Sequence, residues 1–331
     1  PAQFLTSGDG VRIGFVSGSA TLTGNSVVNT ANDGIQVYAV NGTNTTVAAV
    51  SIGNNTVTNV GNGTIALQRD GDGIAVAYTG RFSAISGSNP IGGVLIDGNV
   101  VDDVDALVQF DRDDGRTAGD GIRVLSADGA VTVSNNRVGG TGNIANDGIQ
   151  IADVTRGVTV NSNTVGSAGT TIGNVTEDGD GIVVEDTGLY ASAGSTYTPS
   201  AGLGAVTVSN NTITNVTGSV AAFDRDGPVA SFSAGDGIRT TRIDGGLTID
   251  SNLINSVGDD GIQVDTVAGS VTVTNNDVTF EGSVSTKGDG IVIAGFSGLD
   301  SVAACLACQA RSEGGVAAQL AYGTFPDPPI L

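Results

Sequence analysis

The stretch GDGIRVLSADGAVTVSNNRV, residues 119–138, contains the pattern that decides the fold. It opens on Asp-Gly, continues with alternating apolar residues and closes on an Asn pair. Side chains two residues apart lie on one face of a strand, so Ile122 and Val124 are expected to face a common core. Taken alone, the stretch is also compatible with a β-hairpin that turns at its second Asp-Gly.

The same pattern recurs along the chain. Asp-Gly followed by Ile or Val occurs nine times, with the Asp at Asp9, Asp33, Asp72, Asp120, Asp147, Asp180, Asp236, Asp260 and Asp289. An apolar-x-apolar triplet and a marker Asn follow each of the first eight, at Asn25, Asn55, Asn99, Asn136, Asn163, Asn211, Asn252 and Asn276. Five of the eight Asp-to-Asn separations are 16 residues, and the shortest full period is 24 residues. A repeat that keeps its markers and accepts insertions at fixed places is typical of a solenoid.

Three short strands fit one 24-residue period, and stacked coils lie about 4.8 Å apart. The sequence therefore predicts an all-β fold, a parallel β-helix of about nine coils. A hairpin would not require the same markers nine times; a β-sandwich or barrel is the remaining alternative. The Gly after each Asp is expected to supply a positive φ, and the marker Asn to adopt the left-handed conformation at a second bend.

The pattern GDGIxV…VTVSNNxI resembles the repeats of right-handed, pectate-lyase-like parallel β-helices over roughly residues 8–293. It is also similar to bacterial surface and adhesin β-solenoids. The resemblance implies a single-stranded, right-handed helix. Such repeats occur in lyases, hydrolases, epimerases, tailspikes and adhesins, so the resemblance does not choose an activity.

Two regions are expected: a parallel β-helix over residues 1–300, and an irregular cap with a Pro-rich tail over 301–331. The Ala-rich part of the second region, 301–321, suggests a short helix or a last irregular turn. Cys305 and Cys308 lie there. They are expected to form a local disulfide or to act as two small apolar residues.

The repeated positions form columns when coils stack. The Ile/Val column is expected to fill the interior, and the marker Asn column to form a ladder in which each amide donates to the next coil. For the Asp column, two interpretations stand. Each Asp faces water and caps its own turn, or cations lie between some of the carboxylates.

Four acidic insertions make calcium a possible cofactor, although none is required. QRDGDG (68–73), FDRDDG (110–115), FDRDGP (223–228) and EDGDG (177–181) offer the hard oxygen ligands that Ca²⁺ prefers. The candidate ligands are Asp70, Asp72, Asp113, Asp114, Asp178, Asp180, Asp224 and Asp226. The alternative is a set of solvated turns in which Arg69, Arg112 and Arg225 pair with neighbouring Asp residues. None of the four insertions matches the sequence of an EF-hand loop. The three related loops at 68–73, 110–115 and 223–228 are expected to project from one side of the solenoid and to form a binding surface.

Composition excludes several classes of partner. The 331 residues carry 13 Lys+Arg against 34 Asp+Glu, a net charge of −21, with no His. Such an acidic surface repels nucleic acid and anionic lipid. No apolar run approaches the roughly 20 residues that cross a bilayer, so no direct membrane insertion is expected.

The sequence favours a secreted or cell-surface structural solenoid, such as an adhesin, surface-layer or fibre subunit. Because the repeat begins at Gly8, we expect the chain either to continue upstream or to associate end to end with itself. Other surface proteins and glycans are further candidate partners. The alternative is a polysaccharide lyase or hydrolase. Asp259-Asp260 is an acidic pair, but the Gly-His-Gly and Arg-x-Lys segments of the related hydrolases are absent, so no catalytic residue is assigned.

Overall fold

The computed structural model describes residues 8–42, 47–61, 71–80, 92–105, 119–168, 179–188, 204–216, 235–279, 290–296, 309–311 and 319–320. In these ranges every element in chain order is a β-strand. A search of the same residues finds no helix with the length and hydropathy needed to span a membrane.

The strands form three parallel sheets, and up to β24 each sheet is built from every third strand of the chain. Sheet A contains β1 (Val11–Ser17), β4 (Ile35–Asn41), β7 (Ile74–Ala77), β10 (Ile122–Ala127), β13 (Ile149–Val154), β16 (Ile182–Thr187), β19 (Ile238–Ile243), β22 (Ile262–Val267), β25 (Ile291–Phe296) and β27 (Gln319–Leu320). Sheet B contains β2 (Ala20–Thr23), β5 (Val50–Gly53), β8 (Val94–Asp97), β11 (Val131–Ser134), β14 (Val158–Asn161), β17 (Val206–Ser209), β20 (Leu247–Asp250) and β23 (Val271–Thr274). Sheet C contains β3 (Ser26–Val28), β6 (Thr56–Val60), β9 (Val100–Val104), β12 (Arg137–Val138), β15 (Thr164–Gly166), β18 (Thr212–Val216), β21 (Leu253–Val257), β24 (Asp277–Thr279) and β26 (Gln309–Arg311).

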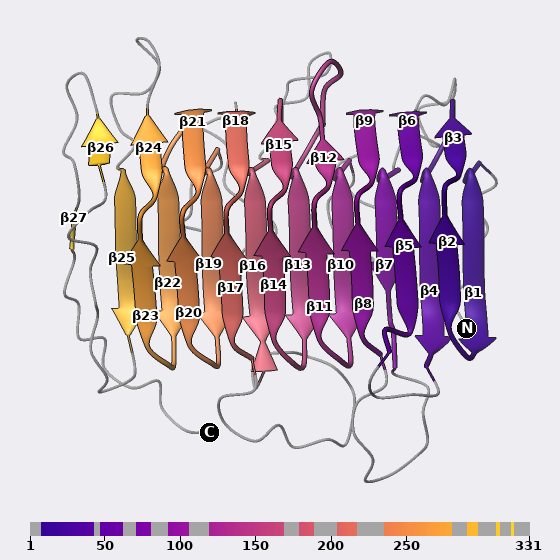
Figure 1. Ribbon diagram of the computed structural model, residues 1–331, viewed down its shortest axis with the longest axis horizontal. Coiled ribbons are helices and arrows are strands. Elements are labelled where there is room, and N and C mark those ends of the chain that lie inside the picture. Colours follow the sequence, from indigo (N-terminus) through magenta and orange to yellow (C-terminus); the bar gives the residue numbers. More distant parts are fainter. Residues whose placement is uncertain are drawn as a thin grey trace, which may run out of the picture.

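Each of the eight coils from β1 to β24 contributes one strand to each sheet, and the coils stack along one axis (Figure 1). The chain is a right-handed parallel β-helix of about nine coils, as predicted. The hairpin interpretation is wrong, because β10 pairs with β7 and β13 whereas β11 pairs with β8 and β14. Strands that follow each other in sequence therefore lie in different sheets.

The coils share one apolar interior. Ile122 lies in register between Ile74 and Ile149, and all three side chains are fully buried. The Val residues of sheets B and C join the same core cluster. Burying a side chain of this size contributes roughly 1.5–3 kcal/mol. The predicted Ile/Val column is confirmed.

The marker Asn residues form the predicted ladder between sheets B and C. The Asn163 side chain is typical: its Nδ2 donates to Asn211 Oδ1 (3.0 Å) and to the Val133 carbonyl (2.9 Å). Its Oδ1 accepts from the backbone N–H and the side-chain amide of Asn136 (2.9 and 3.0 Å). The direction of donation, from each coil to the next, is confirmed along the ladder from Asn25 to Asn276.

The backbone at that corner differs from the prediction. The left-handed residue is the one before the marker Asn, with φ between 53° and 55° at Asn54, Asn135, Asn210 and Asn275. The prediction assigned the bend to the wrong member of the pair. The marker turns inward, where its amide joins the ladder, and the preceding residue makes the bend because a short polar side chain tolerates the left-handed region.

The Gly after each marker Asp was predicted to supply a positive φ, and the structure gives a different reason for it. The Gly34 and Gly148 backbones have no positive φ. A Cβ added at Gly148 would lie 2.6 Å from the carbonyl oxygen of Gly181 in the next coil and 2.2 Å from a methyl group of Val165. The column requires glycine because the coils approach each other closely here, which leaves no room for a side chain.

Two short strands lie in the region predicted as an irregular cap. β26 pairs with β24 and extends sheet C, and β27 pairs with β25 and extends sheet A. The boundary at residue 300 stays a prediction. Cys305 and Cys308 fall outside the described residues, and so does Asp289.

Replacing one member of the ladder tests its contribution. Asn163→Ala removes four buried hydrogen bonds and leaves partners in the two adjacent coils unsatisfied. We expect the free energy of unfolding to fall by about 3 kcal/mol, measured by urea denaturation. Thr159→Ala, at an exposed position of the same coil, is the control and should change stability by no more than about 0.5 kcal/mol. Equal effects of the two substitutions would contradict the ladder as a source of stability.

Candidate functional site

The marker Asp residues line the corner where the chain enters sheet A. From Asp33 to Asp236 each carboxylate is buried, and its Oδ1 accepts the backbone N–H of the next marker Asp. Asp72 accepts from Asp120 N (2.9 Å), and Asp180 accepts from Asp236 N (2.8 Å). The expectation that each Asp faces water and caps its own turn is therefore wrong. The carboxylates stabilise the adjacent coil, because parallel stacking brings that coil's N–H groups within reach.

Buried arginine side chains compensate part of the negative charge of the marker Asp residues. Arg123 Nη2 lies 2.6 Å from Asp72 Oδ2, and Arg239 Nε donates to Asp180 Oδ2 at 2.7 Å. Both arginines are nearly inaccessible to solvent. These two arginines were not identified from the sequence, although each directly follows Asp-Gly-Ile in its repeat. Buried arginines facing stacked carboxylates offset repulsion that would otherwise destabilise the fold.

The predicted calcium ligands are distributed as follows. Asp72 and Asp180 belong to the marker column and bind backbone N–H groups and arginine, as described above. They are separated by the coils of Asp120 and Asp147, so the structure does not bring them together. The other six candidates lie outside the described residues: Asp70, Asp113, Asp114, Asp178, Asp224 and Asp226. Calcium binding by these loops stays a prediction.

The structure does bring three other carboxylates together. Asp236, Asp259 and Asp260 each place an oxygen so that these atoms lie within 4.8 Å of one another. Their exposed fractions are 0%, 5% and 7%. At that separation two ionised carboxylates repel by about 3–4 kcal/mol at an effective dielectric constant of about 20. We call these three residues the acidic cluster.

Asp236 is the most constrained member of the acidic cluster. Its Oδ1 accepts the Asp260 backbone N–H at 2.9 Å, whereas its Oδ2 has no hydrogen-bond partner. Burial is the main cause that raises the pKa of Asp236 well above 3.8, and the charges of Asp180, Asp260 and Asp259 add to it. A carboxylate in this position requires a proton or a cation to be stable.

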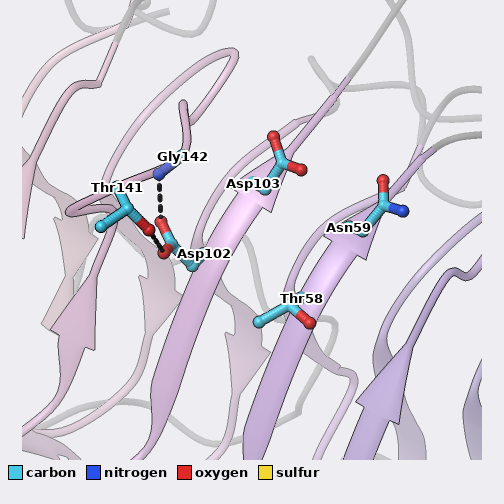
Figure 2. Close-up of a pocket in the computed structure, with 6 residues that line it drawn as sticks. All are labelled: Thr58, Asn59, Asp102, Asp103, Thr141 and Gly142. Atoms are coloured by element: carbon cyan, nitrogen blue, oxygen red, sulfur yellow. Dashed lines mark hydrogen bonds between the residues drawn. The ribbon is translucent and has the colours of Figure 1, made fainter.

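A pocket of about 400 Å³ lies on the outer side of sheet C. Figure 2 shows Asp103 on β9 and Asn59 on β6 with their polar ends on the same side. Asp102 instead turns to Thr141 Oγ1 (2.7 Å) and the Gly142 N–H (2.9 Å), which donate to its two oxygens (Figure 2). The pocket offers amide, hydroxyl and carboxylate groups for hydrogen bonding to a polar ligand.

The sequence matches no protein-family model and no curated protein. A search of solved structures found similarity to the enzymatically active domain of tailspike protein 2 from bacteriophage CBA120. The two are 12% identical, the match covers 87% of this chain and 39% of that chain, and the TM-score is 0.25. The β-helix fold of this chain follows from its own strand pairing.

The raised pKa of Asp236 predicts the effect of Asp236→Asn in metal-free buffer. The folded-state pKa is above the unfolded value, so the wild type loses stability as pH rises from about 4 through the folded-state pKa. Asn keeps the Oδ1 acceptor and carries no charge. We therefore expect the melting midpoint of Asp236→Asn to exceed that of the wild type at neutral pH, and the difference to shrink toward pH 4.

Asp250→Asn is a control of opposite sign. Hydrogen bonds from Thr274, Asn275 and Ser251, with Thr274 first, lower the pKa of Asp250 below its ordinary value. Its contribution to stability is present above the unfolded-state pKa and is lost as pH falls through the folded-state pKa. Asp250→Asn should lower the midpoint at neutral pH. A lower midpoint for both variants at neutral pH would contradict the raised pKa of Asp236.

Proposed function

We propose that the chain is an extracellular or cell-surface structural β-solenoid of the adhesin, surface-layer or fibre class. The observation that carries this proposal is the use of its polar columns. The buried Asn and Asp side chains and two buried arginines bond between coils, so they serve stacking rather than chemistry. The net charge of −21 is consistent with a solvated surface, and it repels nucleic acid.

Self-association end to end is the mode of assembly that we favour. Among the described residues, no strand pairs with the outer edges of β1, β2 and β3. Unpaired edges of parallel strands are templates for another chain. The same end exposes large apolar side chains, since Phe15 on β1 is 68% exposed and Val28 on β3 is 52% exposed. A second copy of this chain would continue the three sheets and cover both side chains.

The association can be tested with variants at that end. We expect the average mass of the wild-type chain, measured by size-exclusion chromatography with light scattering, to rise with concentration. The double variant Phe15→Glu/Val28→Glu should remain monomeric, because it places a charge at each of the two apolar positions that the second copy would cover. Leu253→Glu is the matched control, since Leu253 is an exposed apolar residue on β21 in the body of the solenoid. A wild type that is monomeric at every concentration would overturn this mode of assembly.

The second candidate function is a polysaccharide-active enzyme, favoured by the pocket on sheet C. An exposed carboxylate beside amide and hydroxyl groups can hydrogen-bond to sugar hydroxyls, and two carboxylates suffice for glycoside hydrolysis. Against this candidate, both oxygens of Asp102 already accept hydrogen bonds.

A screen against acidic and neutral polysaccharides separates the two functions. Under the structural proposal, incubation with the full chain should yield no new reducing ends and no unsaturated products. Asp103→Asn is the matched variant, because it alters the free carboxylate of the pocket and leaves the Asp102 hydrogen bonds in place. Depolymerisation by the wild type that is lost in Asp103→Asn would replace the structural proposal with the enzymatic one.

A further inference from the structure

We propose that the acidic cluster of Asp236, Asp259 and Asp260 is a binding site for a divalent cation, with Ca²⁺ as the preferred ion. The site lies at the corner that leads into β19 and β22, and it is distinct from the acidic insertions. In the part of the chain that the structure describes, it is the one group of three or more acidic side chains close enough to share an ion.

The first argument comes from a break in the repeat at Asp259. The residue before a marker Asp is Gly in six coils and Asn in two, and only Asp259 carries a charge at this position. The two Asn residues show what the position does in a neutral coil. Asn32 Nδ2 donates to Asp9 Oδ1, and Asn146 Nδ2 donates to Asp120 Oδ1, both at 2.8 Å.

An ionised Asp259 cannot make that contact. The equivalent Asn side chain donates to the marker Asp of the preceding coil, which for Asp259 is Asp236. A carboxylate has no proton to donate, so the substitution replaces an attractive contact with a repulsive one. A cation between the carboxylates of Asp259 and Asp236 would make the contact between these two residues attractive again.

The second argument is the Oδ2 atom of Asp236. This atom belongs to a side chain with no exposed surface and has no hydrogen-bond partner, although its carboxylate lies against those of Asp259 and Asp260. Asp180 and Asp33 accept hydrogen bonds at Oδ2 from Arg239 and Gln36. The Oδ2 atoms of Asp72 and Asp120 lie 2.6 and 3.9 Å from nitrogens of Arg123, so a cationic side chain faces them. A cation held by the three carboxylates would supply the partner that Asp236 Oδ2 lacks.

The chemistry of the site selects the class of ion. Its ligands are carboxylate oxygens, and the chain contains no His, which favours a hard cation over zinc or copper. Ca²⁺ binds oxygen at about 2.3–2.6 Å, so oxygens on opposite sides of the ion are separated by up to about 5 Å. That range accommodates oxygens within 4.8 Å of one another. Mg²⁺ requires shorter bonds of about 2.0–2.1 Å and a stricter geometry, so we expect it to bind more weakly.

The experiment uses the full chain, stripped with EDTA and titrated with CaCl₂ by isothermal calorimetry and by thermal melting. The wild type should bind Ca²⁺, and its melting midpoint should rise with Ca²⁺ concentration, because an ion that binds only the folded state stabilises it. Asp259→Asn should bind at this site at least tenfold more weakly, or lose one equivalent of Ca²⁺ if the loops also bind it. In EDTA, this variant should melt at or above the wild-type temperature, because Asn supplies the donor found at Asn32 and Asn146.

Asp277→Asn is the matched control, since it removes one exposed carboxylate from β24 and should leave Ca²⁺ binding unchanged. Asp259→Gly is the second variant, because Gly is the commonest residue at this position of the repeat, and it should show the same loss of Ca²⁺ binding. Identical Ca²⁺ isotherms for the wild type and both Asp259 variants would overturn the proposal. A wild-type midpoint that responds to pH and not to Ca²⁺ would also overturn it, and would assign a shared proton to the cluster.

Discussion

Parallel stacking of like coils is the constraint on which the rest of this structure depends. When each residue lies over its equivalent in the next coil, a buried polar side chain meets a copy of itself. An amide can satisfy this arrangement alone, because it both donates and accepts, and Asn163 bonds to Asn136 on one side and Asn211 on the other. A carboxylate cannot, so every buried Asp needs a donor from elsewhere.

The two polar columns solve this problem in different ways. In the Asn ladder each side-chain amide donates to the amide of the next coil, and backbone groups supply its other bonds. The Asp column relies on the backbone N–H of the next coil and on side chains such as Arg123 and Arg239, which reach the second oxygen. Where a coil lacks such a side chain, or adds a further carboxylate as Asp259 does, the column has excess negative charge. The cation site that we propose therefore lies at a departure from the repeat, not at a position that the repeat keeps.

Several features of the fold could be predicted from the sequence because they depend on periodicity. The coil length, the inward Ile/Val column and the direction of the Asn ladder follow from the spacing of markers, since spacing decides which residues share a face. The roles of Gly148 and of the marker Asp residues could not be predicted this way. They depend on distances between neighbouring coils, such as the 2.6 Å between a Cβ at Gly148 and the Gly181 carbonyl oxygen. The pocket beside Asp103 likewise combines β6, β9 and the segment after β12, whose proximity no local pattern records.

The sequence by itself determined that the chain coils, which residues fill the interior and which amides form a ladder, because these follow from repetition at a fixed period. The tertiary structure decided what the repeated carboxylates bind and which of them meet. Asp259 and Asp260 are neighbours in sequence, but their approach to Asp236 depends on the register between two coils. The physical reason is that a repeat specifies equivalent positions, whereas electrostatic energy depends on the separation of particular atoms, which only the stacked coils establish.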